Sequence, residues 1–188
     1  MIDLERYPRE ITLHNGVTLV FRPMDRNDVD RLWDFFQRIP PEEKMFFRQD
    51  VSRREVVQQW ADTLDYGLVL PILALEGDHV VGDATLHRQR TGWKRRVGVV
   101  RVQIAPHCRH IGLGTAMVRE LRHIGEKSAL HYLMAEVIEE QSAAVRAFEK
   151  MGFFRAATYG SFVNDRRGGL HNLIVLLYRM SSPEDLDA

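Results

Sequence analysis

The sequence predicts a mixed α/β fold in one domain, and three observations support this prediction. The chain has 188 residues, of which 45% are hydrophobic, enough for one sizeable core without disulfide bonds. Its apolar residues change period along the chain, from the three-and-four spacing of helices to the near-continuous runs of buried strands. The order of these segments, with helices early, then a hairpin, then alternating strands and helices, is typical of α/β proteins.

The first third of the chain predicts one strand and two helices. The apolar run at 18–21 stops at an arginine and a proline, as a short strand does. A helix follows Asn27 or Asp28, because apolar residues recur at spacings of three and four as far as Phe36, before two prolines end it. A second apolar helical face covers 52–64, after a capping box.

The rest of the chain predicts a hairpin, two helices and four further strands. The predicted strands are 68–75, 79–86, 97–104, 132–138, 153–162 and 172–180, and the predicted helices are 114–125 and 142–151. Residues 1–188 are expected to form a single domain, with an N-terminal extension at about 1–10. The acidic tail, 181–188, is expected to be disordered.

Composition limits the classes of protein. Lysine and arginine total 26 and so do aspartate and glutamate, so the whole molecule is not expected to bind nucleic acid. The single cysteine, Cys108, excludes an intramolecular disulfide and a thiolate cluster. The chain shows neither the apolar core of a signal peptide nor a long apolar run, so we expect no membrane partner and a cytoplasmic location.

The most informative segment lies between the strand that ends at Ile104 and the helix that begins near Gly114. A proline and a short loop follow the strand, and then Gly112 and Gly114 open the helix. Glycines at a helix N-terminus let backbone N–H groups surround an anion, and the helix adds roughly half a positive charge. This turn is therefore suited to a pyrophosphate.

Two other interpretations of this turn stay open. A Rossmann dinucleotide site also begins with G-x-G, and Glu136 lies near the distance expected for its acidic residue. However, Met117 occupies the position of the third glycine, and five residues separate Ile104 from His110. The glycines could also form a tight turn without a ligand.

The same segment resembles a known family motif. Arg109-x-x-Gly112-x-Gly114, after a strand that ends in Ile104-x-Pro106, resembles the acyl-CoA-binding motif of the GNAT N-acetyltransferases, [Q/R]-x-x-G-x-[G/A]. Two further segments resemble family signatures in the right order: Phe21-Arg22-Pro23-Met24-x-x-x-Asp28, and Glu136-Val137 followed by Ala144 and Phe148-Glu149-Lys150-Met151-Gly152-Phe153. The resemblance covers about residues 11–180.

Within the family, the chain resembles the acetyltransferase domain of bacterial protein lysine acetyltransferases. The shared pieces are His14-Asn15-Gly16, Phe46-Phe47-Arg48 and Asp165-x-x-Gly168-x-x-His171-Asn172-Leu173. The resemblance implies a mixed, mostly antiparallel sheet of about seven strands with about four helices. It implies direct transfer of an acetyl group from acetyl-CoA to a primary amine, and a protein lysine is the acceptor that it favours. A small-molecule acceptor, an acyl-CoA sensor with little turnover, and a homodimer remain open.

The resemblance also implies roles for individual residues. The cofactor-binding residues are expected to be Val102, Ile104, Arg109, His110, Ile111, Gly112, Leu113, Gly114, Thr115, Gln141 and Phe148. Val99 stands where related enzymes carry a glutamate, and Glu136 is the candidate general base because it matches the base position of the family's N-terminal alanine acetyltransferases. Phe148 replaces the tyrosine that commonly reprotonates the thiolate, so Tyr159 or Tyr178 is an alternative acid. Acceptor residues are expected from the early helices and from the loop before the last strand, near His171.

Two local features complete the expectations. His107, Cys108 and His110 lie together in the loop, but no acidic ligand is near them in sequence, so no metal is expected. Between Asp83 and Glu120 the chain has no acidic residue, whereas the same window holds Arg88, Arg90, Lys94, Arg95, Arg96, Arg101, Arg109 and Arg119. This basic segment is favourable for a polyanionic cofactor.

Overall fold

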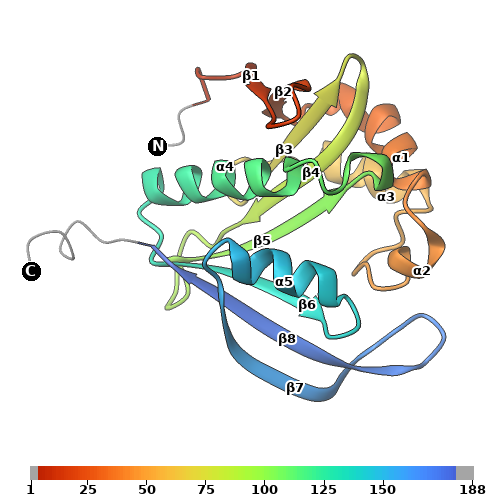
Figure 1. The fold of residues 1–188 in the computed structure, drawn as a ribbon, viewed down its shortest axis with the longest axis vertical. Helices are drawn as coiled ribbons and strands as arrows, with labels where there is room; N and C mark the ends of the chain where they lie inside the picture. The colour runs from red at the N-terminus through yellow and green to blue at the C-terminus, as the bar shows by residue number, and fades with distance from the viewer. Residues whose placement is uncertain (1–3, 181–188) are drawn as a thin grey trace, which may run out of the picture.

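The fold is one eight-stranded sheet with helices packed against it (Figure 1). The structure, a computed structural model, describes residues 4–180. The strands are β1 (Arg9–Thr12), β2 (Thr18–Pro23), β3 (Val69–Glu76), β4 (His79–His87), β5 (Val97–Ile104), β6 (Tyr132–Ile138), β7 (Phe154–Asn164) and β8 (Leu170–Arg179). The helices are α1 (Val29–Gln37), α2 (Pro41–Lys44), α3 (Arg54–Asp62), α4 (Leu113–Lys127) and α5 (Ser142–Lys150).

The strand order is β1-β2-β3-β4-β5-β6-β8-β7, and β5 and β6 are the parallel pair of the described sheet. They are parallel because α4 connects them as a crossover. Their pairing covers only residues 97–99 against 132–134. Beyond these residues, the β5 edge that faces β6 has no strand partner within the described chain.

The structure confirms the predicted α/β class and the mostly antiparallel sheet, and it adds an eighth strand. Sequence analysis missed β1 because its four residues alternate between half-buried and exposed and contain no apolar run. Residues 9–10, placed in the N-terminal extension, pair with β2 instead. The predicted tail, 181–188, lies outside the described residues. None of the described helices is long and apolar enough to span a membrane.

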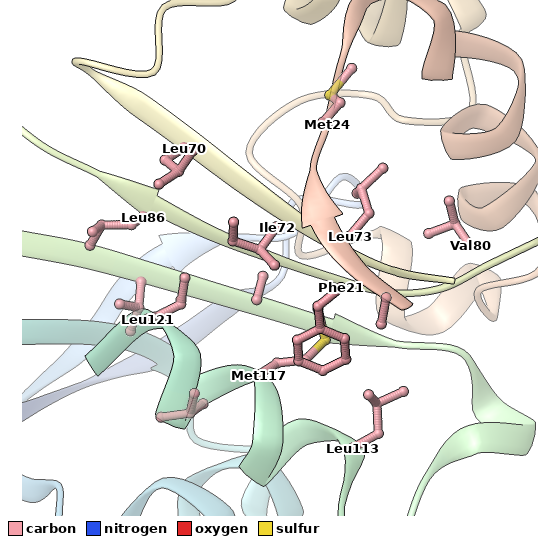
Figure 2. Packing of buried hydrophobic residues seen from close by; sticks show 14 of the residues in the cluster. Phe21, Met24, Leu70, Ile72, Leu73, Val80, Leu86, Leu113, Met117 and Leu121 are labelled. Carbon is pink, nitrogen blue, oxygen red and sulfur yellow. The ribbon is translucent and has the colours of Figure 1, made fainter. Parts of the chain in front are cut away.

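The face of β4 and β5 beneath α4 is apolar and closely packed (Figure 2). Leu113, Met117 and Leu121 of α4 are buried in the core. Gly82 of β4 makes room for the helix, because a Cβ there would lie 2.6 Å from the Met117 sulfur. This packing fixes the position of the α4 N-terminus relative to the end of β5.

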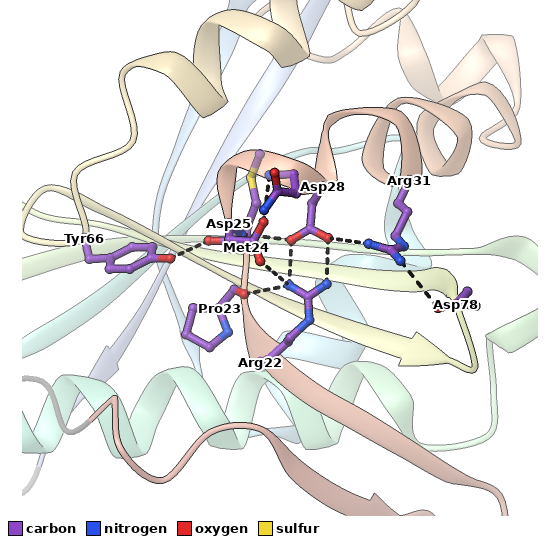
Figure 3. A network of polar contacts seen from close by, with 9 residues as sticks. Arg22, Pro23, Met24, Asp25, Asp28, Arg31, Tyr66 and Asp78 are labelled. Carbon is purple, nitrogen blue, oxygen red and sulfur yellow. Dashed lines mark hydrogen bonds and ion pairs between the residues drawn. The ribbon is translucent and has the colours of Figure 1, made fainter.

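A buried ion pair joins β2 to the start of α1 (Figure 3). The two terminal guanidinium nitrogens of Arg22 donate to the two carboxylate oxygens of Asp28, each at 2.6 Å, and Asp28 has no exposed surface. Asp28 also accepts the Asp25 N–H at 2.8 Å within a capping box. Burial alone would raise the pKa of Asp28, but the hydrogen bonds from Arg22 and Asp25 lower it.

Candidate active site

The turn before α4 has the geometry of an anion-binding helix N-terminus. Gly112 is the N-cap residue with φ +86°, and no side chain caps the helix. The first N–H groups of the helix therefore have no side-chain acceptor within the described structure. A Cβ at Gly112 would lie 2.8 Å from the His14 ring, so both backbone conformation and space require glycine.

Seven predicted cofactor residues form this turn and the first residues of α4: Arg109, His110, Ile111, Gly112, Leu113, Gly114 and Thr115. The Arg109 side chain is directed elsewhere. Its guanidinium donates to both Glu43 carboxylate oxygens at 2.8 Å and to the Ile104 carbonyl at 3.2 Å. Arg109 thus ties α2 to the end of β5, and its backbone is the part that belongs to the turn.

Val102 and Ile104 present backbone groups along the open edge of β5. The Ala105 N–H donates to the Val81 carbonyl and therefore points toward β4. Successive N–H groups of a strand point to opposite edges, so the N–H groups of Ile104 and Val102 point toward β6. Pairing between these strands ends at Val99. Both predicted residues therefore lie where an extended ligand could pair with the strand.

Polar side chains gather on the face of β4 and β5 opposite α4, which we call the polar face. Its cross-strand pairs are Asp83 with Gln103, Thr85 with Arg101, and His87 with Val99. Gly82 faces α4, and side chains alternate along a strand, so these residues face away from the helix. Sequence analysis missed Asp83 and His87, although their period-two spacing in an otherwise apolar strand was a usable signal.

Burial shifts the protonation of two groups on the polar face. It raises the pKa of Asp83 to about 6, although the Thr85 hydroxyl donates to this carboxylate at 3.1 Å and Arg101 is near. It also lowers the pKa of His87 to about 4, and the charges of Arg101 and Arg48 contribute to this shift. Asp83 therefore changes protonation near neutral pH, as suits a group that exchanges protons with a substrate.

Glu136, the predicted base, lies on the same polar face. Met134 pairs with Val99 of β5, and Glu136 follows two residues later on the same side of β6. Its half-buried carboxylate forms an ion pair with Arg48, which follows α2. Gln103 of β5 donates to Glu43 at 3.3 Å, so α2 also contacts this face. The structure thus brings three distant segments of the chain together around Glu136.

Gln141 and Phe148 lie at the start and in the interior of α5. Gln141 is the N-cap residue, and Phe148 is buried with its ring 5.0 Å from that of Phe153. Of the two alternative acids, Tyr178 is hydrogen-bonded to Arg122 of α4, whose guanidinium lies 4.1 Å from its ring centroid. Tyr159 is 47% exposed on β7. Among the described residues, neither tyrosine has a hydrogen bond or ring contact with a predicted cofactor residue.

The turn between β7 and β8 meets the segment after α2, at the place where acceptor residues were expected. His171 contacts the Glu140 and Asp165 carboxylates at 2.8 Å and 3.0 Å, and these hydrogen bonds raise its pKa. The Phe46 ring lies edge-on to His171 at 5.0 Å. We call this region the acceptor rim, formed by residues 45–50 and 164–171.

The structure also places an acid beside the loop that holds His107, Cys108 and His110. Donor atoms of Glu76, His107 and Cys108 lie within 4.8 Å of one another. Burial, with the charge of Glu76, raises the pKa of the Cys108 thiol, which disfavours the thiolate that binds metals. The expectation that this loop holds no metal stays a prediction.

Comparison with known families decides the classification. The model of the acetyltransferase (GNAT) family matches residues 29–153, more than half of the chain. The chain belongs to the GNAT acetyltransferase family. The matched segment includes β4, β5, the turn, α4, β6 and α5. The search of curated proteins found no match.

Solved GNAT structures share the whole fold at low sequence identity. The GNAT domain of S. lividans PAT has a TM-score of 0.75 and 15% identity, covering 91% of this chain and 96% of that one. The ribosomal-protein-alanine N-acetyltransferase from Brucella melitensis has a TM-score of 0.73 and 17% identity, covering 85% and 98%. YncA from Salmonella typhimurium, solved with its cofactor acetyl-CoA, has a TM-score of 0.73 and 15% identity, covering 87% and 95%.

These findings fix the class of enzyme. The predicted GNAT fold is confirmed, and the chain is an N-acetyltransferase of the GNAT family, for which acetyl-CoA is the typical acyl donor. Identities below one fifth show the shared fold and do not identify the acceptor.

Proposed function

We propose that this GNAT enzyme transfers the acetyl group of acetyl-CoA directly to a primary amine, with a protein lysine as the first acceptor. One observation carries the proposal: the uncapped N-terminus of α4 follows the open edge of β5, and the same strand borders the polar face with Asp83 and Glu136. A turn suited to bind an anion therefore lies at the end of β5, and a proton acceptor lies on the polar face that the same strand borders.

The residues of the turn before α4 and of the open edge of β5 fit acetyl-CoA. The uncapped N–H groups after Gly112 would hold the pyrophosphate, and the backbone of Val102 and Ile104 would pair with the pantetheine arm. Gln141 and Phe148 would border it from α5. When bound, the cofactor supplies an acetyl thioester.

Glu136 is the proposed general base. A lysine amine titrates near about 10.4, so it must lose a proton before it attacks. The Glu136 carboxylate would take that proton directly or through water, and its ion pair with Arg48 holds the carboxylate on the polar face. The Ile104 N–H is the proposed donor to the thioester oxygen, a role typically worth about 10²–10³ in rate.

The position of the usual acid for the leaving thiolate is held by Phe148, which has no proton to give. Tyr178 accepts a hydrogen bond from Arg122 of α4, and within the described chain it has no hydrogen bond or ring contact with a predicted cofactor residue. A thiol titrates near about 8.5, so water can protonate the thiolate. We therefore expect a slow enzyme rather than an inactive one.

A peptide acceptor is supported by the position of the acceptor rim. Asp50 and Arg166 of the rim are partly exposed, and the Phe46 ring packs against His171 between the two segments. Such a rim can contact an extended peptide beside the reacting lysine. The Brucella enzyme of similar fold takes its name from a protein acceptor, ribosomal-protein alanine. A small-molecule amine is the second acceptor class to test.

The test is release of coenzyme A from acetyl-CoA with a panel of acceptors. The panel holds lysine peptides with blocked N-termini, peptides with free N-terminal alanine, and small polyamines. We expect turnover with the lysine peptides, and turnover confined to N-termini or polyamines would overturn the acceptor assignment.

A sensor without turnover is the alternative favoured by Val99 and Phe148, which lack the usual catalytic groups. Isothermal titration with acetyl-CoA, run beside the same assay, separates the two functions. Tight binding without turnover on any acceptor would establish the sensor.

A further inference from the structure

A hollow of about 630 Å³ lies between the N-terminal segment and the outer face of α4. Its walls come from residues 6–14 and from one side of α4, and no residue of β5, β6 or α5 lines it. It is therefore separate from the open edge of β5 proposed to bind the pantetheine arm. Of the predicted cofactor residues, Gly112 and Thr115 also line this hollow.

The hollow is positively charged. Its ionisable lining comprises Arg6, Arg9, Arg119, His14, His123 and Glu120. Glu120 is 5% exposed, and it already binds Arg6 at 3.4 Å, Arg9 at 3.2 Å and the Tyr7 hydroxyl. Three guanidinium charges against one carboxylate leave two positive charges before either histidine is protonated.

The α4 side of the hollow offers hydrogen-bond donors in a row. Thr115, Arg119 and His123 recur every four residues and so share one side of the helix. Arg119 is exposed, and the described residues give it no ion pair. A guanidinium presents a planar fork of N–H groups that matches the oxygens of a phosphate.

The hollow also contains the turn that begins at His14, which the cofactor site does not use. The His14 ring lies against Gly112, so a Cβ at Gly112 would meet its Nδ1 at 2.8 Å. Ile11 and Ala116 add apolar wall, and the volume falls within the range of about 300–1,000 Å³ common for small-molecule sites.

We propose that this hollow is a second binding site, specific for a small molecule that carries a phosphate group. Arg119 and Arg9 bind the phosphate oxygens, Thr115 and His123 donate hydrogen bonds, and Glu120 holds Arg6 and Arg9 in place. The site does not depend on the proposed acetyl transfer, because Arg6, Arg9, Arg119 and His123 lie outside the predicted cofactor residues, and it shares Gly112 and Thr115 with them.

The test uses inorganic pyrophosphate as the probe and backbone amide NMR as the readout. Arg119 follows Gly112 by seven residues, a distance of about 10 Å along a helix, so the two sites report through different amides. We expect saturable shifts of the amides of residues 12–14 and 119–123, in addition to shifts of residues 109–115 from the cofactor turn. Shifts confined to residues 109–115 would overturn the second site and leave the proposed function intact.

Arg119→Ala and Arg119→Glu are the decisive variants, because an exposed helix position tolerates both. We expect Arg119→Ala to weaken the second set of shifts by about tenfold or more, since a hydrogen bond to a charged group contributes at least that factor. Arg119→Glu should abolish the set, and shifts of residues 109–115 should persist in both. Arg95→Ala is the matched control, an exposed arginine far along the chain from the hollow whose guanidinium donates to the Gly92 carbonyl. Equal weakening by Arg95→Ala would show a general surface effect and overturn the proposal.

Discussion

The two faces of β4 and β5 differ in how the chain builds them. The face beneath α4 is apolar, and the turn that follows it comes from one continuous segment, 104–115. The polar face takes its groups from β4, β5, β6 and the segment after α2. Backbone N–H groups can bind an anion from one short stretch of chain, whereas proton transfer needs side chains that a sheet must bring together.

The largest effect is expected from Asp28, because it is fully buried and its ion pair with Arg22 joins β2 to the start of α1. Asp28→Asn leaves the partly buried Arg22 charge with the half-exposed Asp25 carboxylate, at 3.8 Å, as its remaining carboxylate partner among the described residues, and it removes the negative charge that accepts the Asp25 N–H. We expect unfolding free energy to fall by about 2–4 kcal/mol, measured by urea denaturation.

Asp30→Asn is the control for Asp28, since its ion pair with Arg54 is exposed and contributes less than about 1 kcal/mol. The low pKa of Asp28 also stabilises the fold above the ordinary value of 3.8. Stability should therefore be lost as pH falls below that value, and less steeply in Asp28→Asn. Equal losses in both variants would contradict the role of the buried pair.

The second largest effect is expected from Glu136, and it tests the polar face alone. Glu136→Gln removes the proposed base and keeps the size of the side chain, so kcat should fall by about 10² or more, with little change in KM for acetyl-CoA. Glu139→Gln is the matched control, an acid just beyond β6 that contacts Asn172. A kcat unchanged across pH in Glu136→Gln would remove the assignment and leave Asp83 as the next candidate.

A substitution in the turn before α4 should weaken cofactor binding and leave the side chains of the polar face unchanged. Gly112→Ala places a Cβ at positive φ and against His14, whereas at Gly114 a Cβ meets its nearest atom, in Ile104, at an ordinary 3.8 Å. We expect KM for acetyl-CoA to rise about tenfold in Gly112→Ala, because strain of this kind costs about 1–3 kcal/mol. Gly114→Ala should change KM far less, and equal effects would show that φ and His14 do not limit the turn.

The smallest effect is expected from Asp83 and His87 of the polar face, as a change in how steeply the free energy of unfolding varies with pH. With a pKa of about 6, folded Asp83 holds its proton where the unfolded chain has lost it, so this group lowers stability as pH rises from about 4 to 6. With a pKa of about 4, folded His87 has lost its proton where the unfolded chain keeps it, so this group raises stability over nearly the same range.

The two polar-face groups therefore oppose each other in the wild type. Relative to it, Asp83→Asn should gain stability with rising pH between about 4 and 6, and His87→Gln should lose it. Denaturation midpoints across this range measure both slopes, with exposed Asp78→Asn as control. If the slope of stability with pH changed in the same direction in both variants, the result would contradict the opposite pKa shifts of Asp83 and His87.

The sequence predicted what depends on local pattern. Apolar spacing located α1, α3, α4 and α5, and alternating or continuous apolar runs located every described strand except β1. The glycines at 112 and 114 identified the turn, because its conformation and its donors belong to the backbone. Strand β1 was not predicted, because its four residues contain no apolar run and are too few to show a periodic pattern. Arg109 was predicted to bind the cofactor, and its ion pair with Glu43 was not predicted because the two residues are 66 positions apart in the chain.

By itself, the sequence determined the α/β class, the family resemblance and the glycine turn before α4, since each depends on spacing along one stretch of chain. Only the tertiary structure decided which acids share a face with Glu136, that Tyr178 is held by Arg122, and that Glu120 lies beneath a basic hollow. The physical reason is that charges act through space. Segments far apart in the chain become neighbours only when strand pairing and the packing of α4 place them side by side.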